Sequence, residues 1–534
     1  MISHENGDFD FVVVGAGASG CAVAGRLAAI PGARVAVLEA GRAGRLRIEA
    51  IPAATIYTNG HPFYDWKLVS QPDPSRLDRT EDWPRGRGPG GSTRINGMIY
   101  VRGAPGDFDA WRDLGAEGWS YRDVLPYFRR IETSADGESQ VRGASGPLSV
   151  SPLPFIHDLT PRFIAAAGEA GLPFNPDING ECQDGIGYVQ ASARNGRRHD
   201  SFTAFLKPAI ARGAAKILDG ARARRVIFGN GRATGVEFEQ DGMIRMARAR
   251  RGVILSGGAI HTPQLLMLSG IGPAARLREL GIAVVADAPE VGCNLMEHAG
   301  IWMGLKVNVP TLNQQVNLPG MARAMFRWLA GKGPAANPTA QAVGFARTTA
   351  GLQSPDIQLH LTPFGHIGRG SDRKLAPFPM VSVVASVNHP RSKGRIDLAS
   401  DDPADAPLIF PRLLDAPEDM ATLRRGIELC GRIVDAPAFR DFVEERIGWP
   451  DLNAGDAEAE QQIRSLAGPI YHPVGTCRMG SDPASVVDPG LRVRGVEGLF
   501  VADTSIMPRH ISGNTQAVAM MIGDRAADLI GMPV

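Results

Sequence analysis

The sequence predicts a mixed α/β protein in which a Rossmann-like dinucleotide-binding domain is combined with a second domain of antiparallel sheet covered by helices. A glycine-rich turn, Gly15 to Gly20, follows an apolar β-branched run and leads into an alanine-rich helical segment. A second apolar run, Arg34 to Leu38, ends at the acidic residue Glu39. Later segments alternate or run apolar over the length of a strand, and an amphipathic helix pattern follows them.

Composition sets limits on the size and the partners of the protein. The chain has 534 residues, of which 44% are hydrophobic and 21% charged, so at least two structural units are expected. Lys and Arg number 57 against 56 Asp and Glu, which gives a formal net charge of +1. This balance lacks the basic surplus that phosphate-backbone binding requires, so a small-molecule substrate is expected and nucleic acid is not.

The cysteines and the N-terminal segment indicate where the protein works. The five cysteines are widely separated and show no metal-ligand spacing, so we expect a reducing compartment and no metal.

The first ten residues are polar and acidic, and they lack both the basic region and the apolar region of a secretory signal. No apolar run reaches the length of a membrane span. We expect a cytoplasmic protein and leave peripheral membrane association open.

The first glycine cluster has the spacing of a dinucleotide-binding turn. Gly15 permits the tight turn, Gly17 lets the backbone approach a pyrophosphate, and Gly20 lets the helix pack closely on the strand. The pyrophosphate would meet the helix N-terminus, where free N–H groups favour negative charge. Glu39 would accept hydrogen bonds from ribose hydroxyls. The order of strand, turn, helix, strand and acid favours this interpretation over an empty glycine turn, but does not separate FAD from NAD.

Two further clusters, Arg85 to Gly103 and Gly257 to Pro273, are long and unusual. Together with Tyr471 to Gly480 and Leu499 to Gln516, they resemble the signature segments of the glucose-methanol-choline (GMC) family of flavoprotein oxidoreductases, in the family's order. The resemblance spans essentially the whole chain. One departure is Pro89, where the family usually has an aliphatic residue, and a local backbone adjustment is expected there.

The resemblance implies FAD as the cofactor. It places Trp66 near the adenine end and Asp503 near the phosphates. The side-chain amide of Asn96 offers both a donor and an acceptor to a pyrimidine-like ring edge. The residues it implies for FAD binding are Gly15, Gly17, Ala18, Ser19, Gly20, Glu39, Ala40, Trp66, Arg87, Gly91, Ser92, Asn96, Gly97, Met98, Ala223, Ala502, Asp503, Asn514, Thr515 and Gln516.

The resemblance also implies that His472 is the catalytic base and that Asn514 lies beside it. A histidine titrates near neutral pH and can take the hydroxyl proton of an alcohol while a hydride leaves the adjacent carbon for flavin N5. Asn514 would hold the substrate oxygen and is also expected to cap a helix that starts at Thr515. A lone histidine is more often buried and satisfied, and we interpret His261 and His298 as structural residues of this kind.

The signatures at both ends and in the middle must converge on one cofactor, so the FAD-binding domain is expected to be discontinuous. We assign to it residues 1–155, 205–300 and 465–534, and to the substrate domain residues 156–204 and 301–464. Within the substrate domain, strands are expected at Ile357 to Phe364, Met380 to Val387 and Gly394 to Ser400, and a helix at Asp419 to Val434.

The segment Pro310 to Ala340, with a helix near Ala322 to Leu329, is either a lid over the substrate entrance or a surface excursion.

The favoured function is FAD-dependent oxidation of a primary or secondary alcohol to an aldehyde or ketone. The C-terminal segments look most like those of bacterial sorbose, polyethylene glycol and other aliphatic alcohol dehydrogenases. A hydroxynitrile lyase, in which FAD performs no redox step, and a non-catalytic binding protein are the alternatives. The electron acceptor, whether oxygen or a quinone, dye or redox protein, stays open, as does assembly into a homo-oligomer.

The sequence predicts that FAD is held without a covalent bond. Some family members attach the flavin to a histidine at the position of Ile95, and an aliphatic side chain cannot form that bond. Acid precipitation of the purified protein should therefore leave a colourless pellet and a yellow supernatant. Flavin that stays with the pellet would contradict this prediction.

Overall fold

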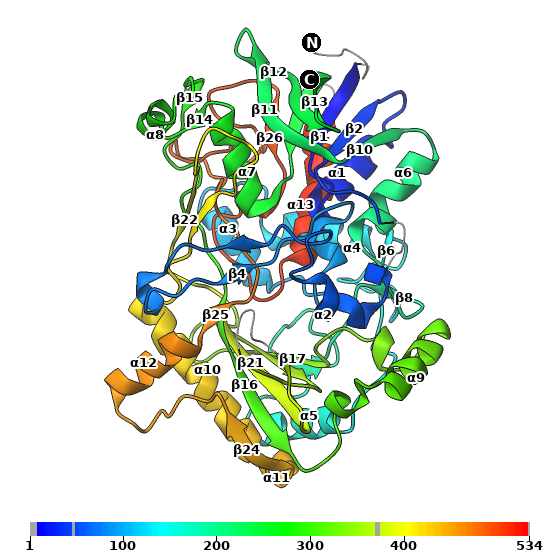
Figure 1. Cartoon of the computed structure of the whole chain (residues 1–534), viewed down its shortest axis with the longest axis vertical. Coiled ribbons are helices and arrows are strands. Elements are labelled where there is room, and N and C mark those ends of the chain that lie inside the picture. The colour runs from blue at the N-terminus through cyan, green and yellow to red at the C-terminus, as the bar shows by residue number, and fades with distance from the viewer. Residues whose placement is uncertain (1–7, 45–47, 369–373, 532–534) are drawn as a thin grey trace.

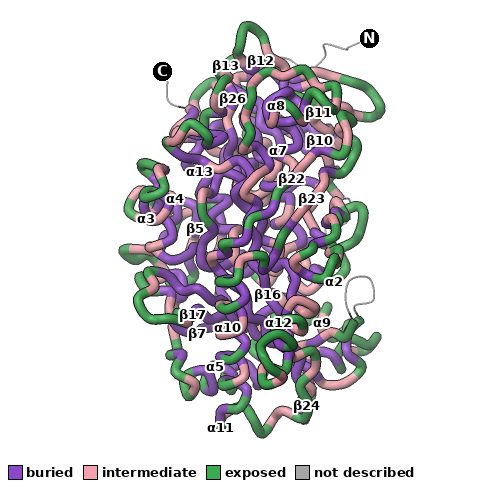
Figure 2. Tube along the Cα trace, turned by 90° about the vertical axis from the view of Figure 1, so that its left-hand side faces the viewer, coloured by how far each residue is buried: buried purple, intermediate pink, exposed green. Residues whose placement is uncertain are grey.

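The computed structural model of the protein describes residues 8–44, 48–368 and 374–531. Two seven-stranded sheets lie at opposite ends of the molecule (Figure 1). Buried chain runs continuously through the interior from one end to the other, and exposed residues lie mainly at the periphery (Figure 2). The predicted fold class, a Rossmann-like unit joined to an antiparallel sheet with helices on it, is confirmed.

The first sheet has the strand order β10-β2-β1-β13-β12-β11, and β26 also pairs with β13. Its strands are β1 (Phe9–Val14), β2 (Val35–Glu39), β10 (Ala215–Asp219), β11 (Ala221–Gly229), β12 (Arg232–Gln240), β13 (Met243–Leu255) and β26 (Leu499–Val501). Strand β1 runs parallel to β2 and β13, whereas β11, β12 and the first part of β13 form an antiparallel ribbon. The segments of β1, β2 and β13 that pair in parallel are mostly apolar and buried, as expected for the central strands of a parallel sheet.

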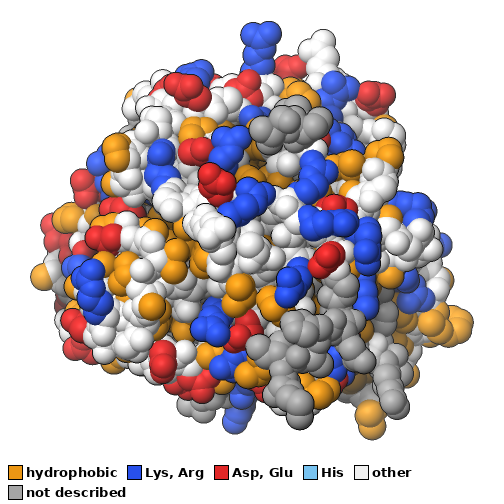
Figure 3. Space-filling view, turned by 90° about the horizontal axis from the view of Figure 1, so that it is seen from above, with side chains coloured by type: hydrophobic (Ala, Val, Ile, Leu, Met, Phe, Trp, Pro, Cys, Tyr) orange, Lys and Arg blue, Asp and Glu red, His pale blue; other side chains and the backbone are white. Residues whose placement is uncertain are grey.

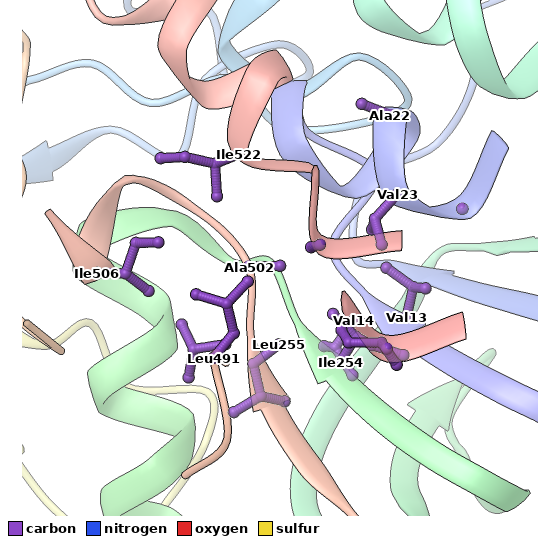
Figure 4. Packing of buried hydrophobic residues seen from close by; sticks show 14 of the residues in the cluster. Val13, Val14, Ala22, Val23, Ile254, Leu255, Leu491, Ala502, Ile506 and Ile522 are labelled. Atoms are coloured by element: carbon purple, nitrogen blue, oxygen red, sulfur yellow. The ribbon is translucent and has the colours of Figure 1, made fainter. Parts of the chain in front are cut away.

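Three helices accompany these parallel strands; the first two start within four residues of a strand's carboxyl end, and the third packs on the first. They are α1 (Ala18–Leu27), α7 (Gly258–Leu268) and α13 (Gln516–Gly531). The apolar side chains beneath them come from both halves of the sequence, as Figure 4 shows for Val14, Leu255 and Ile522. Helix α7 begins at Gly258, four residues before the predicted start at Thr262. The C-terminal helix and the N-terminal turn therefore belong to one hydrophobic core.

The second sheet is antiparallel, with the order β24-β16-β21-β18-β17-β7, and β25 also pairs with β16. Its strands are β7 (Gly185–Tyr188), β16 (Ala299–Val307), β17 (Ala342–Ala346), β18 (Ile357–Thr362), β21 (Met380–Val387), β24 (Val443–Ile447) and β25 (Gly468–Pro469). One face packs on α10 (Pro417–Asp435), and α5 (Leu159–Glu169) and α11 (Pro437–Arg440) join the same apolar cluster. The strands predicted at 357 and 380 and the helix predicted at 419 are confirmed. The boundaries between the two domains stay a prediction.

The remaining elements connect the sheets or lie on the surface. Further α-helices are α2 (Thr55–Thr58), α3 (Pro105–Asp113), α4 (Tyr121–Ile131), α6 (Lys207–Ala211), α8 (Ala274–Glu279) and α12 (Asp456–Leu466). Short paired strands are β3 (Leu68–Val69), β4 (Asp82–Trp83), β5 (Glu132–Ser134), β6 (Leu148–Val150), β8 (Ala193–Arg194), β9 (Arg197–Arg198), β14 (Ile271–Gly272), β15 (Ala286–Asp287), β19 (His366–Ile367), β20 (Lys374–Leu375), β22 (Arg395–Asp397) and β23 (Leu408–Phe410). Across the described ranges, no helix has both the length and the hydropathy for a bilayer span.

The segment between β16 and β17 forms α9 (Leu318–Leu329) on the outside of the molecule (Figure 1). The helix is longer than predicted because it starts at a good N-terminal signal. The side chain of Asn317 accepts a hydrogen bond from the N–H of Gly320 at 2.9 Å, and Pro319 occupies the first turn. The short helix η7 (Pro334–Ala336) follows and packs with the side chain of Trp328.

Gly20 provides a test of the packing of α1 on the first sheet. A Cβ at this position would lie 1.9 Å from the carbonyl oxygen of Gly15, so Gly20→Ala forces the helix away from the turn. We expect the free energy of unfolding to fall by about 1–3 kcal/mol or more, measured by urea denaturation. Gly168→Ala is the matched control, because Gly168 is exposed in α5 and nothing lies within 4 Å of its Cβ position. That substitution should stabilise by about 0.5–1 kcal/mol; equal effects at both sites would refute the packing argument.

Candidate active site

The backbone around His472 is tied to the segment that precedes β16. Met296 and Val474 exchange two backbone hydrogen bonds of 3.0 Å, and the N–H of His472 donates to the Glu297 carboxylate at 2.7 Å. The residue before the histidine, Tyr471, has a positive φ of 71°, which a bulky side chain rarely adopts. This strained turn fixes the direction of the His472 side chain.

The ring nitrogens of three neighbouring histidines are in defined protonation states. Nε2 of His298 lies 2.9 Å from the carbonyl oxygen of Asn388 and 3.1 Å from that of Ile511, so this nitrogen carries a proton. In a neutral ring its Nδ1 is then an acceptor, and Nδ1 of His472 donates to it across 3.0 Å. Nε2 of His472 is left with a free electron pair. His510 donates from Nε2 to the carbonyl oxygen of His472 at 2.8 Å and stacks on His298 at 3.6 Å between ring centroids.

Burial keeps this cluster uncharged. Loss of solvation lowers the pKa of His472 well below its ordinary value of 6.5. Repulsion from positive charge lowers it further, a charge that His510 and His360 carry only when protonated and that Arg85 carries permanently. The pKa of His298 is also well below 6.5, for the same first reason, and that of His510 falls to about 4. All three imidazoles are therefore neutral at neutral pH, as the tautomer assignment requires.

Asn514 faces the free nitrogen of His472. Its side-chain amide nitrogen lies 3.0 Å from Nε2 of His472, and its oxygen accepts a hydrogen bond of 2.9 Å from the amide of Gln358. The expectation that Asn514 caps the last helix is wrong, because α13 begins at Gln516 and the cap position falls to Thr515. The Asn514 side chain is instead held between the histidine and the second sheet.

Strand β18 adds two polar side chains that the sequence analysis did not select. Gln358 and His360 point to the same face of the strand because side chains alternate along it. Oε1 of Gln358 and Nε2 of His360 are buried and have no hydrogen-bond partner among the described residues. The signal was present in the sequence, since two polar residues alternate with apolar ones in an otherwise apolar strand. Two unpaired polar atoms beside Asn514 are suited to a polar ligand.

Glu297, which is buried, and Arg85, which is half-buried, form a second polar group near His472. Burial raises the pKa of Glu297 to about 8, against the opposing attraction of Arg85 and the hydrogen bond from His472. Burial likewise lowers the pKa of Arg85. Both side chains hold buried atoms without a hydrogen-bond partner among the described residues, namely Oε2 of Glu297 and Nε and Nη2 of Arg85.

The first and second glycine clusters touch through their backbones. A Cβ on Gly91 would lie 2.7 Å from Cα of Gly17, and the N–H of Gly90 donates to the carbonyl oxygen of Ala16 at 2.8 Å. Gly15, Gly90 and Gly91 all have positive φ, which explains why glycine is needed in these turns. The two clusters thus form one glycine-lined cradle at the N-terminus of α1, defined by residues 15–20 and 86–97.

This cradle fits a flavin dinucleotide. Ala18 and Ser19 lie in the first turn of α1, whose N–H groups have no partner within the helix. At its other end, the side-chain amide of Asn96 donates to the side-chain oxygen of Gln516, the first residue of α13. Nε2 of Gln516 is buried and lacks a hydrogen-bond partner among the described residues, so a donor is available for a ring carbonyl. Because Gln516 is two residues from Asn514, the cradle and the histidine adjoin each other.

The carboxylates of two expected FAD ligands accept hydrogen bonds from within the protein, mostly from backbone N–H groups. The carboxylate of Glu39 accepts hydrogen bonds from the N–H groups of Ala16, Gly41 and Gly88 at 2.8–2.9 Å. That of Asp503 accepts from Gly258, Thr262 and Ser505 at 2.6–2.8 Å. Glu39 thereby joins the two glycine clusters of the cradle, and Asp503 joins the start of α7 to the segment after β26; neither role was expected from the sequence.

The other predicted residues lie around these groups. The Trp66 ring packs on His261 at 4.5 Å between centroids, and the guanidinium groups of Arg87 and Arg222 lie over it at 5.2 and 5.9 Å. Desolvation lowers the pKa of His261 to about 4. Of the remaining residues, Ala40 follows β2, Ala223 lies in β11, Ala502 follows β26, Thr515 precedes α13, and Ser92, Gly97 and Met98 lie in the second cluster.

Comparison with known proteins gives one consistent family. Two family models described as GMC oxidoreductase match residues 9–300 and 390–523. An alcohol dehydrogenase [acceptor] of Pseudomonas putida is 38% identical over 532 residues, covering 98% of this chain and 95% of the relative. An oxygen-dependent choline dehydrogenase of Rhizobium etli is 39% identical with the same coverage. Among solved structures, pyridoxine 4-oxidase from Mesorbium loti has a TM-score of 0.88 at 28% identity, covering 98% of this chain and 99% of that one.

The neutral histidine cluster predicts a loss of stability in acid. A histidine whose folded pKa is lowered binds its proton more readily in the unfolded chain, so stability falls as pH drops below 6.5. His510→Gln keeps a side-chain donor for the His472 carbonyl oxygen and removes one titrating group. The slope of the unfolding free energy against pH should fall by up to about 1.4 kcal/mol per pH unit, measured by urea denaturation below pH 6.5. A slope in His510→Gln equal to that of the wild type would contradict the assignment.

Proposed function

The chain belongs to the GMC oxidoreductase family and is an FAD-dependent enzyme acting on CH–OH donors, and we propose that it oxidises a small, uncharged alcohol with His472 as the base. The observation that carries the proposal is the free electron pair on Nε2 of His472, which faces Asn514 across 3.0 Å.

The hydrogen-bond network holds His472 ready to accept a proton at one defined atom. His298 accepts the proton of Nδ1, so the ring cannot present the opposite tautomer toward Asn514. The lowered pKa of His472 keeps Nε2 unprotonated at neutral pH, which a base requires. The role of His298 is to position His472, and it passes no proton to the substrate.

Asn514 would orient the substrate hydroxyl toward Nε2 of His472. Its amide nitrogen already lies at hydrogen-bond distance from that atom, and Gln358 holds its oxygen at 2.9 Å. A hydroxyl that enters between the two side chains can accept from the amide and donate to the imidazole. The unpaired atoms of Gln358 and His360 offer hydrogen bonds to a second polar group of the substrate.

We assign FAD to the glycine-lined cradle. When bound there it supplies the hydride acceptor, which no side chain of the protein provides. The N-terminus of α1 would hold the pyrophosphate, and Asn96 and Gln516 the pyrimidine edge. Ile95 is buried at 3% exposure and offers no nucleophile to the ring system, which supports non-covalent binding.

The electron acceptor is the part of the reaction on which the relatives differ. The Pseudomonas putida relative is named for an unspecified acceptor, whereas the Rhizobium etli relative is named as oxygen-dependent. We propose a dehydrogenase that reduces a quinone or redox protein, in line with the aliphatic alcohol dehydrogenases that the C-terminal segments resemble. Peroxide release equal to alcohol consumption would identify an oxidase instead.

Replacement of His472 tests the assignment. Anaerobic mixing of the yellow holoenzyme with a panel of aliphatic alcohols should bleach the flavin absorbance of the wild type. In His472→Ala the rate constant of bleaching should fall by about 10² to 10⁴. The exposed His61→Ala, with equal bound flavin, should bleach at the wild-type rate. Unchanged bleaching in His472→Ala would refute the base, and a wild type that stays oxidised while it cleaves a hydroxynitrile would establish the lyase alternative.

A further inference from the structure

Helix α9 exposes most of its apolar side chains to solvent. Four of them recur at spacings of three and four residues and so share one face: Leu318, Met321, Met325 and Leu329. Leu318 is 85% exposed and Leu329 67%, and Phe326 beside this row is 78% exposed. A surface helix normally turns such a row toward the core, so this row has no partner within the described chain.

A different side of the helix attaches it to the protein. Trp328 is 7% exposed, donates from Nε1 to the carbonyl oxygen of Gly196 at 3.0 Å, and lies 4.2 Å beneath the guanidinium of Arg197. Ala324 packs in the same small cluster with Ala335 and Ala336 of η7. The helix is therefore anchored with its apolar row facing outward.

The charged residues of the same segment have one sign. From position 311 to position 346 they are Arg323, Arg327 and Lys332, and no acidic residue occurs. All three are exposed, and no salt bridge involves any of them within the described ranges. The chain as a whole is balanced at 57 basic and 56 acidic residues, and the end of the molecule seen in Figure 3 mixes both signs with apolar side chains.

We propose that α9 docks the protein on an anionic lipid bilayer. An exposed apolar row with arginines and a lysine beside it, and no acid, is the pattern of a helix that lies in the membrane interface. The apolar row would enter the boundary between headgroups and acyl chains, and the cationic groups would reach the lipid phosphates. The association with the membrane would be peripheral, because Trp328 anchors the helix to the folded chain.

Charge decides between a bilayer and a second copy of this chain. A symmetric contact through α9 would bring the arginines of one copy close to those of the other, with no acidic residue of the segment to balance them. An anionic surface supplies the missing charge. The bilayer is therefore the occupant that this face fits.

The test uses the full-length holoenzyme and co-sedimentation with vesicles of phosphatidylcholine, with and without phosphatidylglycerol. Wild type should bind vesicles that contain phosphatidylglycerol, and binding should weaken as salt is raised. Phe326→Glu combined with Leu329→Glu should lower the affinity at least tenfold. Arg323→Gln combined with Arg327→Gln should lower it about 25-fold on anionic vesicles, since each basic residue near the surface contributes a factor of about five.

The matched control places the same two charges at the opposite end of the molecule. Met243 and Ile244 are also exposed apolar neighbours, at 48% and 40%, in the hairpin between β12 and β13. Met243→Glu combined with Ile244→Glu should bind vesicles like wild type, and all variants should oxidise a water-soluble alcohol at the wild-type rate. Absence of binding at any composition would overturn the proposal, and so would equal binding by the α9 variants. A wild-type dimer that the Phe326 and Leu329 changes convert to a monomer, without vesicle binding, would establish a second copy as the occupant.

Discussion

Direct backbone contact between glycine-rich segments is the constraint on which the rest of the structure depends. The turn after β1, the second glycine cluster and the N-terminus of α1 meet at distances that leave no room for a side chain. Gly20 lies against Gly15, and Gly91 against Gly17. Because these contacts involve main-chain atoms, no neighbouring side chain can move aside to accept a larger residue. The two sheets and the C-terminal helix are arranged around this cradle.

The carboxylates of Glu39 and Asp503 extend the same constraint by joining segments that are far apart in the chain. Glu39 binds N–H groups of both glycine clusters, and Asp503 binds the start of α7. A buried carboxylate is stable only when its oxygens accept hydrogen bonds, so each of these residues depends on the turns that surround it. The cradle therefore forms as a unit, with residues from the first 40 positions and the last 35 in one hydrogen-bonded assembly.

The histidines beside the cradle are buried and uncharged. Burial lowers the pKa of the three histidines. The carbonyl oxygens of Asn388 and Ile511 fix the tautomer of His298, and His298 in turn fixes the tautomer of His472. The result is an uncharged imidazole on His472, whose Nε2 electron pair faces Asn514. The three histidines, at positions 298, 472 and 510, share no sequence motif. The balanced charge of the whole chain agrees with a small neutral substrate, whereas the basic segment of α9 is a local exception on the surface.

The sequence by itself determined the features that rest on local rules. The spacing of Gly15, Gly17 and Gly20 specified the turn, apolar periodicity specified the strands at 357 and 380, and motif order indicated that both termini meet at one cofactor. The role of His298, the bonds of Glu39, and the polar pair Gln358 and His360 were decided only by the tertiary structure. Hydrogen-bond partners and burial depend on which distant segments pack together. Asn514 was expected both beside His472 and at the helix cap, and only the first of these holds because α13 begins at Gln516.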